Sequence, residues 1–131
     1  SDPAQADPAG RAGRRAAFVA GLFARDPGAD YRARLTADAL RMSPTQEQAL
    51  LRYDAPRRFW RDALHGTDRP VLYVVRPRWR AQGQTLVATH ADARMAVFEQ
   101  AGHALFVDEP DRFNDLLVTF LDHRAAWEPQ A

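Results

Sequence analysis

Cysteine and lysine are both missing from this 131-residue chain. Without cysteine the protein has no disulfide, no thiolate metal site and no cysteine nucleophile. All 18 basic residues are arginines, and 17 acidic residues offset them to a net charge of +1. Such a balanced charge provides no strong field for polyanions, and we expect no nucleic-acid partner. We interpret the pairs Arg14-Arg15 and Arg57-Arg58 as solvated helix faces.

Long apolar runs are also missing, so the sequence predicts no membrane span. Residues 1–10 are rich in proline, alanine and aspartate and have no apolar centre like that of a signal peptide. We therefore expect a flexible segment at residues 1–10, a cytoplasmic location and no membrane partner.

Apolar residues recur at helical spacing through residues 11–66, which predicts a run of helices. Phe18, Val19, Leu22 and Phe23 form the apolar face of the first helix, which we expect to end at residues 26–28 (Asp-Pro-Gly). A second helix is predicted at residues 31–42.

Two further helix starts have clear local signals. Ser43 can cap a helix, Pro44 fits its first turn, and Gln46 can complete a capping box. Pro56 opens another helix, which carries Phe59 and Trp60 and stops at Gly66.

The remaining segment, residues 67–131, alternates strands and helices. Strands are predicted at 71–75 and 94–99, a helix at 79–91 with Leu86 and Val87 inward, a loop at 100–110 and a final helix at 111–127. The strand–helix–strand order predicts parallel strands, and the continuous apolar run at 71–75 is typical of a strand covered on both faces. A parallel sheet of two strands is not stable alone. We therefore expect a homo-oligomer whose copies complete the sheet, with or without domain swapping, or a complementary N-terminal chain.

A group of short motifs around the predicted loop resembles the end of an α/β-hydrolase. The residues are Gly102-His103, Leu105-Phe106, Glu109-Pro110, Phe113 and Phe120-Leu121. In that superfamily the last core strand leads into a Gly-His loop, a hydrophobic pair, a Glu-x-Pro and a helix. The preceding strand, 71–75, is similar to the penultimate core strand, and residues 11–66 are similar to an inserted helical cap.

The resemblance implies a partial α/β-hydrolase fold, with a cap-like region at 11–66 and the C-terminal part of the core at 67–131. It implies hydrolysis of a small carboxylic ester or similar acyl substrate, with His103 as general base and acid and with no cofactor. Gly102 is expected to allow a sharp turn before the histidine, and Glu109 to support the loop. Phe59, Trp60 and Leu105 are expected to line the substrate pocket.

The nucleophile and the acid of such a site are not identifiable. The family's Gly-x-Ser-x-Gly elbow is absent, and in family order it would precede Ser1. Residues 76–79, where many members carry an aspartate, read Arg-Pro-Arg-Trp; Asp2 and Asp7 are alternatives that we interpret as solvated loop acids. A different hypothesis is therefore a non-catalytic remnant or fragment that binds a ligand or another protein.

Four histidines and Asp92 raise the question of a metal. His65, His90, His103 and His123 match no ligand spacing, and His90-x-Asp92 alone is a weak signal. We expect solvated histidines and no metal site.

Overall fold

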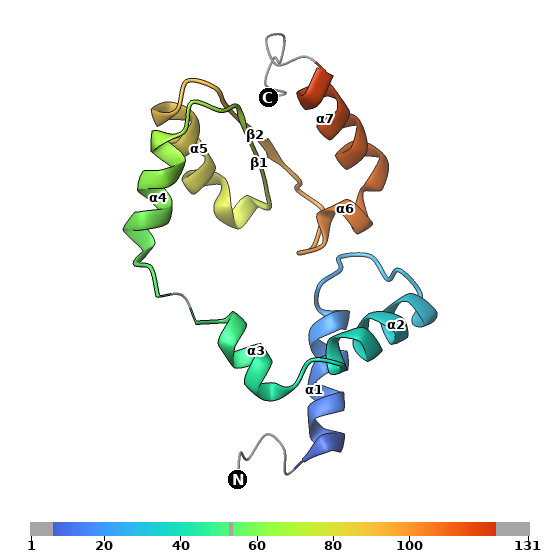
Figure 1. Cartoon of the computed structure of the whole chain (residues 1–131). Coiled ribbons are helices and arrows are strands. Elements are labelled where there is room, and N and C mark those ends of the chain that lie inside the picture. Colours follow the sequence, from blue (N-terminus) through green and yellow to red (C-terminus); the bar gives the residue numbers. More distant parts are fainter. Residues whose placement is uncertain (1–6, 53, 123–131) are drawn as a thin grey trace.

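The computed structural model describes residues 7–52 and 54–122, which form a mixed α/β arrangement around two parallel strands. The first three helices lie together at one end, and the strands lie between α5 and α7 at the other (Figure 1). The elements are α1 (Pro8–Ala20), α2 (Ala29–Leu40), α3 (Pro44–Leu50), α4 (Arg57–Gly66), β1 (Val71–Val75), the 3₁₀ turn η1 (Pro77–Trp79), α5 (Arg80–Thr89), β2 (Ala93–Val97), α6 (Leu105–Asp108) and α7 (Pro110–Asp122). Every helix among the described residues is too short or too polar to cross a bilayer.

Helix α1 begins earlier than the sequence predicts. The Asp7 carboxylate caps it by accepting the Gly10 N–H at 2.8 Å, and Pro8 occupies its first turn. The expectation of a flexible segment through residue 10 is therefore wrong for residues 7–10, while residues 1–6 lie outside the described residues. A side-chain oxygen satisfies an amide that the helix itself cannot pair, which is enough to start the helix here.

Helix α1 also ends earlier than predicted, at Ala20 and not at residues 26–28. The Leu22 carbonyl accepts the Ala104 N–H at 2.9 Å, and the amides of Ala24 and Arg25 donate to the Asp108 side chain. A helix would need these backbone groups for its own ladder. The distant segment 102–108 takes them, so the helix stops although its apolar pattern continues.

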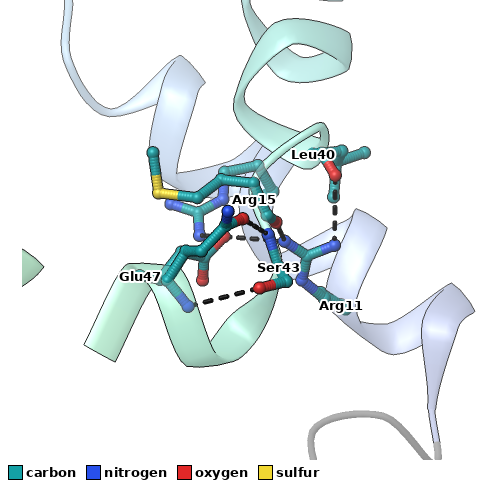
Figure 2. A network of polar contacts seen from close by, with 7 residues as sticks. Arg11, Arg15, Leu40, Ser43 and Glu47 are labelled. Atoms are coloured by element: carbon teal, nitrogen blue, oxygen red, sulfur yellow. Dashed lines mark hydrogen bonds and ion pairs between the residues drawn. The ribbon is translucent and has the colours of Figure 1, made fainter. Parts of the chain in front are cut away.

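Helices α1 and α3 are joined by a polar network around Glu47 (Figure 2). Glu47 Oε1 accepts from Arg11 at 2.7 Å and pairs with Arg15 at 2.6 Å, and all three side chains are partly buried. Arg11 also donates to the carbonyls of Leu40 and Met42 at the end of α2. One carboxylate therefore fixes how three helices meet.

The predicted capping box at the start of α3 is confirmed. Ser43 Oγ accepts the Gln46 N–H at 3.2 Å, and Gln46 Oε1 accepts the Ser43 N–H at 2.8 Å. Ser43 is thus a helix cap, and its hydroxyl already serves the backbone.

The two strands are parallel, as predicted, in a register that pairs Val71 with Ala93 and Val75 with Val97. The second strand is shorter than the predicted 94–99 range, since it ends at Val97. Phe98 follows at once and is fully buried, with its ring centroid 6.5 Å from that of Phe113 on α7. Truncating so large a core side chain typically costs about 3–5 kcal/mol.

The final helix is confirmed as far as the structure describes it. Helix α7 begins at Pro110, one residue before the predicted start, and is described to Asp122. Residues 123–127 of the predicted helix lie outside the described residues.

Helix α5 lies very close to one face of the strands. A Cβ at Gly83 would overlap Met95 Sδ and lie 3.0 Å from Tyr73 Cδ1, so Tyr73 and Met95 face this helix. Leu86 is buried as predicted, but Val87 is 41% exposed and its predicted inward position is wrong. Only the side of α5 that faces the strands is covered.

The outer edges of the strand pair have no strand partner among the described residues. Four of the five β1 residues are only half-buried, although the sequence pattern predicts a strand covered on both faces. Unpaired N–H and C=O groups at a sheet edge can accept a further strand.

The Glu47 network generates a testable prediction. Glu47→Gln removes the charge that Arg11 and Arg15 share, so we expect the α3 amides to exchange with deuterium faster at pH 7, with less change in α5 and α7. Hydrogen exchange followed by mass spectrometry measures this.

The matched control is Asp68→Asn, because Asp68 is highly exposed and pairs with Arg69 on the surface. Equal protection of α3 in the parent and in Glu47→Gln would show that the network does not hold these helices together.

Candidate active site

The histidine turn comprises residues 101–109 and follows the carboxyl end of β2. The segment 100–110 is not entirely loop as predicted, because α6 forms a single helical turn within it. His103 lies just before α6 with its side chain exposed. In parallel sheets this edge is where ligands bind.

Gly102 is buried at the point where the turn meets the chain that follows α1. A Cβ on Gly102 would lie 2.6 Å from the Ala24 nitrogen, 2.6 Å from the Leu22 oxygen and 2.8 Å from the Phe23 carbonyl carbon. The chain does bend at His103, but Gly102 does not have a positive φ, since Gly28 is the one glycine of the described residues that does. Gly102 is needed because two backbone segments touch there.

Asp108 is the carboxylate that fastens the turn. Its Oδ2 accepts the Gly102 N–H at 2.6 Å and the Ala24 N–H at 2.9 Å, and its Oδ1 accepts the Arg25 N–H at 3.0 Å. The residue is only 5% exposed. These charge-assisted bonds link the histidine turn to residues 24 and 25 across more than 80 positions of sequence.

The environment of Asp108 keeps it ionised. Burial raises the pKa of this carboxyl, but the N–H groups of Ala24, Arg25 and Gly102 and the charge of Arg25 together hold the pKa below its usual value. Hydrogen bonds to the charged form therefore prevail over desolvation.

Asp108 supports the turn directly, whereas Glu109 has a different partner. Glu109 Oε2 accepts from Arg112 at 3.2 Å, while its Oε1 is buried without a hydrogen-bond partner in the described chain. Arg112 in turn donates to the Val97 carbonyl at 2.9 Å and lies 4.1 Å from the Phe98 ring centroid. Glu109 thus acts on the end of β2 through Arg112.

A signal for Asp108 was present in the sequence. In the resembled pattern the acid stands two positions before the proline, and the residue two before Pro110 is Asp108. Glu109 is adjacent to that proline. The contact between Asp108 and residues 24 and 25, however, has no signature in the local sequence.

The His103 imidazole makes no hydrogen bond or ion pair with residues 7–52 or 54–122. Asp108 and Glu109 are both committed elsewhere, and Asp7 caps α1. Asp2 lies outside the described residues. No described carboxylate therefore orients His103, and its ring nitrogens are open to a group that approaches from solvent.

The turn after β1 lies at the same edge as the histidine turn. Arg80, at the start of α5, forms an ion pair with Glu99, which directly follows Phe98. Parallel strands place their carboxyl ends together, and this contact joins the two turns there. The edge therefore presents arginines from one turn and the imidazole from the other.

The predicted pocket residues lie on two different elements. Phe59 and Trp60 are on α4, more than half exposed, in an edge-to-face contact with ring centroids 5.2 Å apart. Leu105 begins α6 and is half-buried. Trp60 lines a groove between α4 and α5, and His103 is not part of that groove's lining.

The other described histidines have local partners. His65 is exposed and contacts the Thr89 hydroxyl at 3.2 Å. His90 is only 7% exposed, so the expectation of a solvated histidine is wrong there. Its Nδ1 accepts the Asp92 N–H at 3.2 Å, and its Nε2 is buried without a hydrogen-bond partner among the described residues. The described residues hold no group of three or more histidine or acidic side chains able to bind a metal ion, and His123 lies outside them.

Comparison of the chain with models of known families, with curated protein sequences and with solved structures finds no match.

Because Gly102 has no space for a side chain, we predict that one added methyl group strongly destabilises the fold. Gly102→Ala should lower the free energy of unfolding by about 3 kcal/mol, because backbone atoms on both sides cannot yield. Urea unfolding followed by circular dichroism measures the change.

Gly83→Ala is the matched control, since its new methyl meets mainly the flexible end of Met95. We expect a loss of about 1 kcal/mol or less, because alanine also favours the helix. Similar losses at both positions would contradict the close backbone approach.

The state of Asp108 predicts a pH dependence. Its folded pKa is lowered, so its contribution to stability is fully present above the unfolded pKa and is lost as the pH falls through the folded pKa. Asp108→Asn should cost about 2–3 kcal/mol at pH 7, and the difference from the parent should shrink below about pH 4. Urea unfolding at several pH values tests this, with Asp115→Asn on the exposed side of α7 as control. A difference that stays constant down to about pH 2 would show that the charge of Asp108 contributes nothing.

Proposed function

We propose that this chain contributes the histidine of a hydrolase site that cleaves carboxylic esters or similar acyl bonds. The observation that carries the proposal is the exposed His103 imidazole on a turn whose backbone is fastened by Gly102 and Asp108. General base catalysis needs an accessible imidazole, and here the backbone that carries it is held in place, although no described carboxylate orients the ring. The resemblance to α/β-hydrolases supports the same role.

In the proposed reaction His103 takes a proton from the attacking hydroxyl and returns it to the leaving alcohol. Where the attacking hydroxyl belongs to a serine, a water then attacks the acyl-serine with His103 as base, which releases the carboxylic acid and restores the serine. Ser43 does not supply that hydroxyl on the proposal, because its Oγ already caps α3. The nucleophile is then a serine from another polypeptide segment, or a water that His103 activates. The hydrogen-bond donors that stabilise the oxyanion also come from another polypeptide segment on this proposal.

The unpaired strand edges support an assembly as the active form. We propose that strands from a second copy, or from a complementary chain, extend β1–β2 and bring the missing groups to the carboxyl edge. The same assembly would also cover large apolar side chains that are exposed in the single chain. On this proposal Leu105, which belongs to the histidine turn, lies nearer to the acyl group than the α4 aromatics do.

A binding module without catalysis is the second candidate. Two observations favour it: no described carboxylate orients His103, and α7 exposes Leu117, Val118 and Leu121 by 38–59%. An apolar helix face of this kind is suited to a partner protein.

The test is hydrolysis of p-nitrophenyl butyrate by the purified chain. We expect turnover above that of the same concentration of free imidazole, and a loss of about 100-fold or more in His103→Ala. His65→Ala, which removes an exposed histidine of α4, should retain the parent's rate.

The assay is repeated over a range of protein concentrations. If a second copy completes the site, the rate per chain rises with concentration in step with dimer formation measured by sedimentation. No turnover above imidazole, or equal rates in the two variants, would leave the binding module as the better account.

A further inference from the structure

We propose that the groove between α4 and α5 binds a small organic phosphate that carries a flat ring, such as a nucleoside phosphate. The groove has a volume of about 650 Å³, well within the range of small-molecule sites. A second groove, between α2 and α3, is of similar size, but its lining contains a single arginine and no aromatic ring. The α4–α5 groove is the one of these two that combines several cations with tryptophan rings.

One wall of the groove is cationic. Arg57, Arg58 and Arg61 all come from α4 and line it, and its lining contains no aspartate or glutamate. Arg61 contacts Asp62 at 3.4 Å, but both side chains are about two-thirds exposed, so solvent weakens that pair. Guanidinium groups bind phosphate oxygens in pairs of parallel hydrogen bonds, which makes a phosphate the matching anion.

The groove also offers aromatic surface from both sides. Trp60 comes from α4 and Trp79 from η1, and they are 56% and 44% exposed. Phe59 packs edge-on against Trp60, and the Arg78 guanidinium lies 4.7 Å from the Trp79 ring centroid. These neighbours limit the orientations of both indoles. Exposed indole faces stack well on a planar base, and such stacking typically strengthens binding.

The two helices are tied at one end of the groove. The His65 Nδ1 at the end of α4 contacts the Thr89 hydroxyl at the end of α5, and Figure 1 shows the two helices side by side. Leu64 and Leu86 give this end an apolar floor, while Gln82 adds a neutral hydrogen-bonding group. A ligand with a phosphate at the arginines and a flat ring at one of the indoles would use both parts of this lining.

Isothermal titration calorimetry of the full chain with ADP tests the proposal. We expect saturable binding that is at least about tenfold weaker in the triple variant Arg57→Gln/Arg58→Gln/Arg61→Gln, and also weaker in Trp60→Leu. The control is Arg14→Gln/Arg34→Gln/Arg41→Gln, which removes the same charge from exposed positions on α1, α2 and the residue after α2 and should bind as the parent does.

Adenosine and inorganic pyrophosphate separate the two halves of the ligand. Both should bind more weakly than ADP, because each lacks either the phosphates or the ring. Equal binding of ADP and adenosine, equal loss in the two triple variants, or no ADP binding at all would overturn the proposal. His103→Ala should bind ADP as the parent does, so this outcome is independent of the hydrolase proposal.

Discussion

The Asp108 carboxylate is the interaction on which the arrangement of this chain depends. Its two oxygens satisfy amides from Gly102 on its own turn and from Ala24 and Arg25 after α1. A neutral side chain of the same size could not accept all of these bonds. Burial alone would favour the protonated acid, and the amide donors reverse that preference. The first helix ends early, Gly102 has no space for a side chain, and His103 projects to solvent, all because these two segments meet.

The N-terminal helices depend on a second carboxylate used in a similar way. Glu47 forms ion pairs with Arg11 and Arg15 of α1 (Figure 2), and Arg11 donates a hydrogen bond to the Leu40 carbonyl at the end of α2. The hydrogen bond from Arg11, helped by the charges of both arginines, lowers the pKa of Glu47, although desolvation acts to raise it. In both places one ionised acid joins segments that lie far apart in the sequence. This is consistent with a described core that contains few fully buried side chains, Phe98 being the largest.

Local signals predicted the local structure well. The Ser43 capping box, the strand at 71–75 and the start of the final helix follow from patterns within a few residues, and the parallel pairing follows from the strand–helix–strand order. The contacts that shape the candidate site are not local. Asp108 bonds residues more than 80 positions away, and the α4–α5 groove needs α4 beside η1 and α5. From the sequence alone we interpret the arginine pair 57–58 as a solvated face. Its proposed role in binding arises only because η1 and α5 lie beside α4.

The long separation between Asp108 and Ala24 also bears on how the chain folds. Closing a loop of this length costs conformational entropy before any contact compensates for it, so such contacts form late and slow the folding reaction. During synthesis, α1 and α2 leave the ribosome long before residue 108 exists. Until then the amides of residues 24 and 25 lack the carboxylate that later binds them, and α1 is free to extend along its apolar pattern. The residues after Ala20 must therefore either unwind from a longer helix or remain non-helical until residues 102–108 have been synthesised.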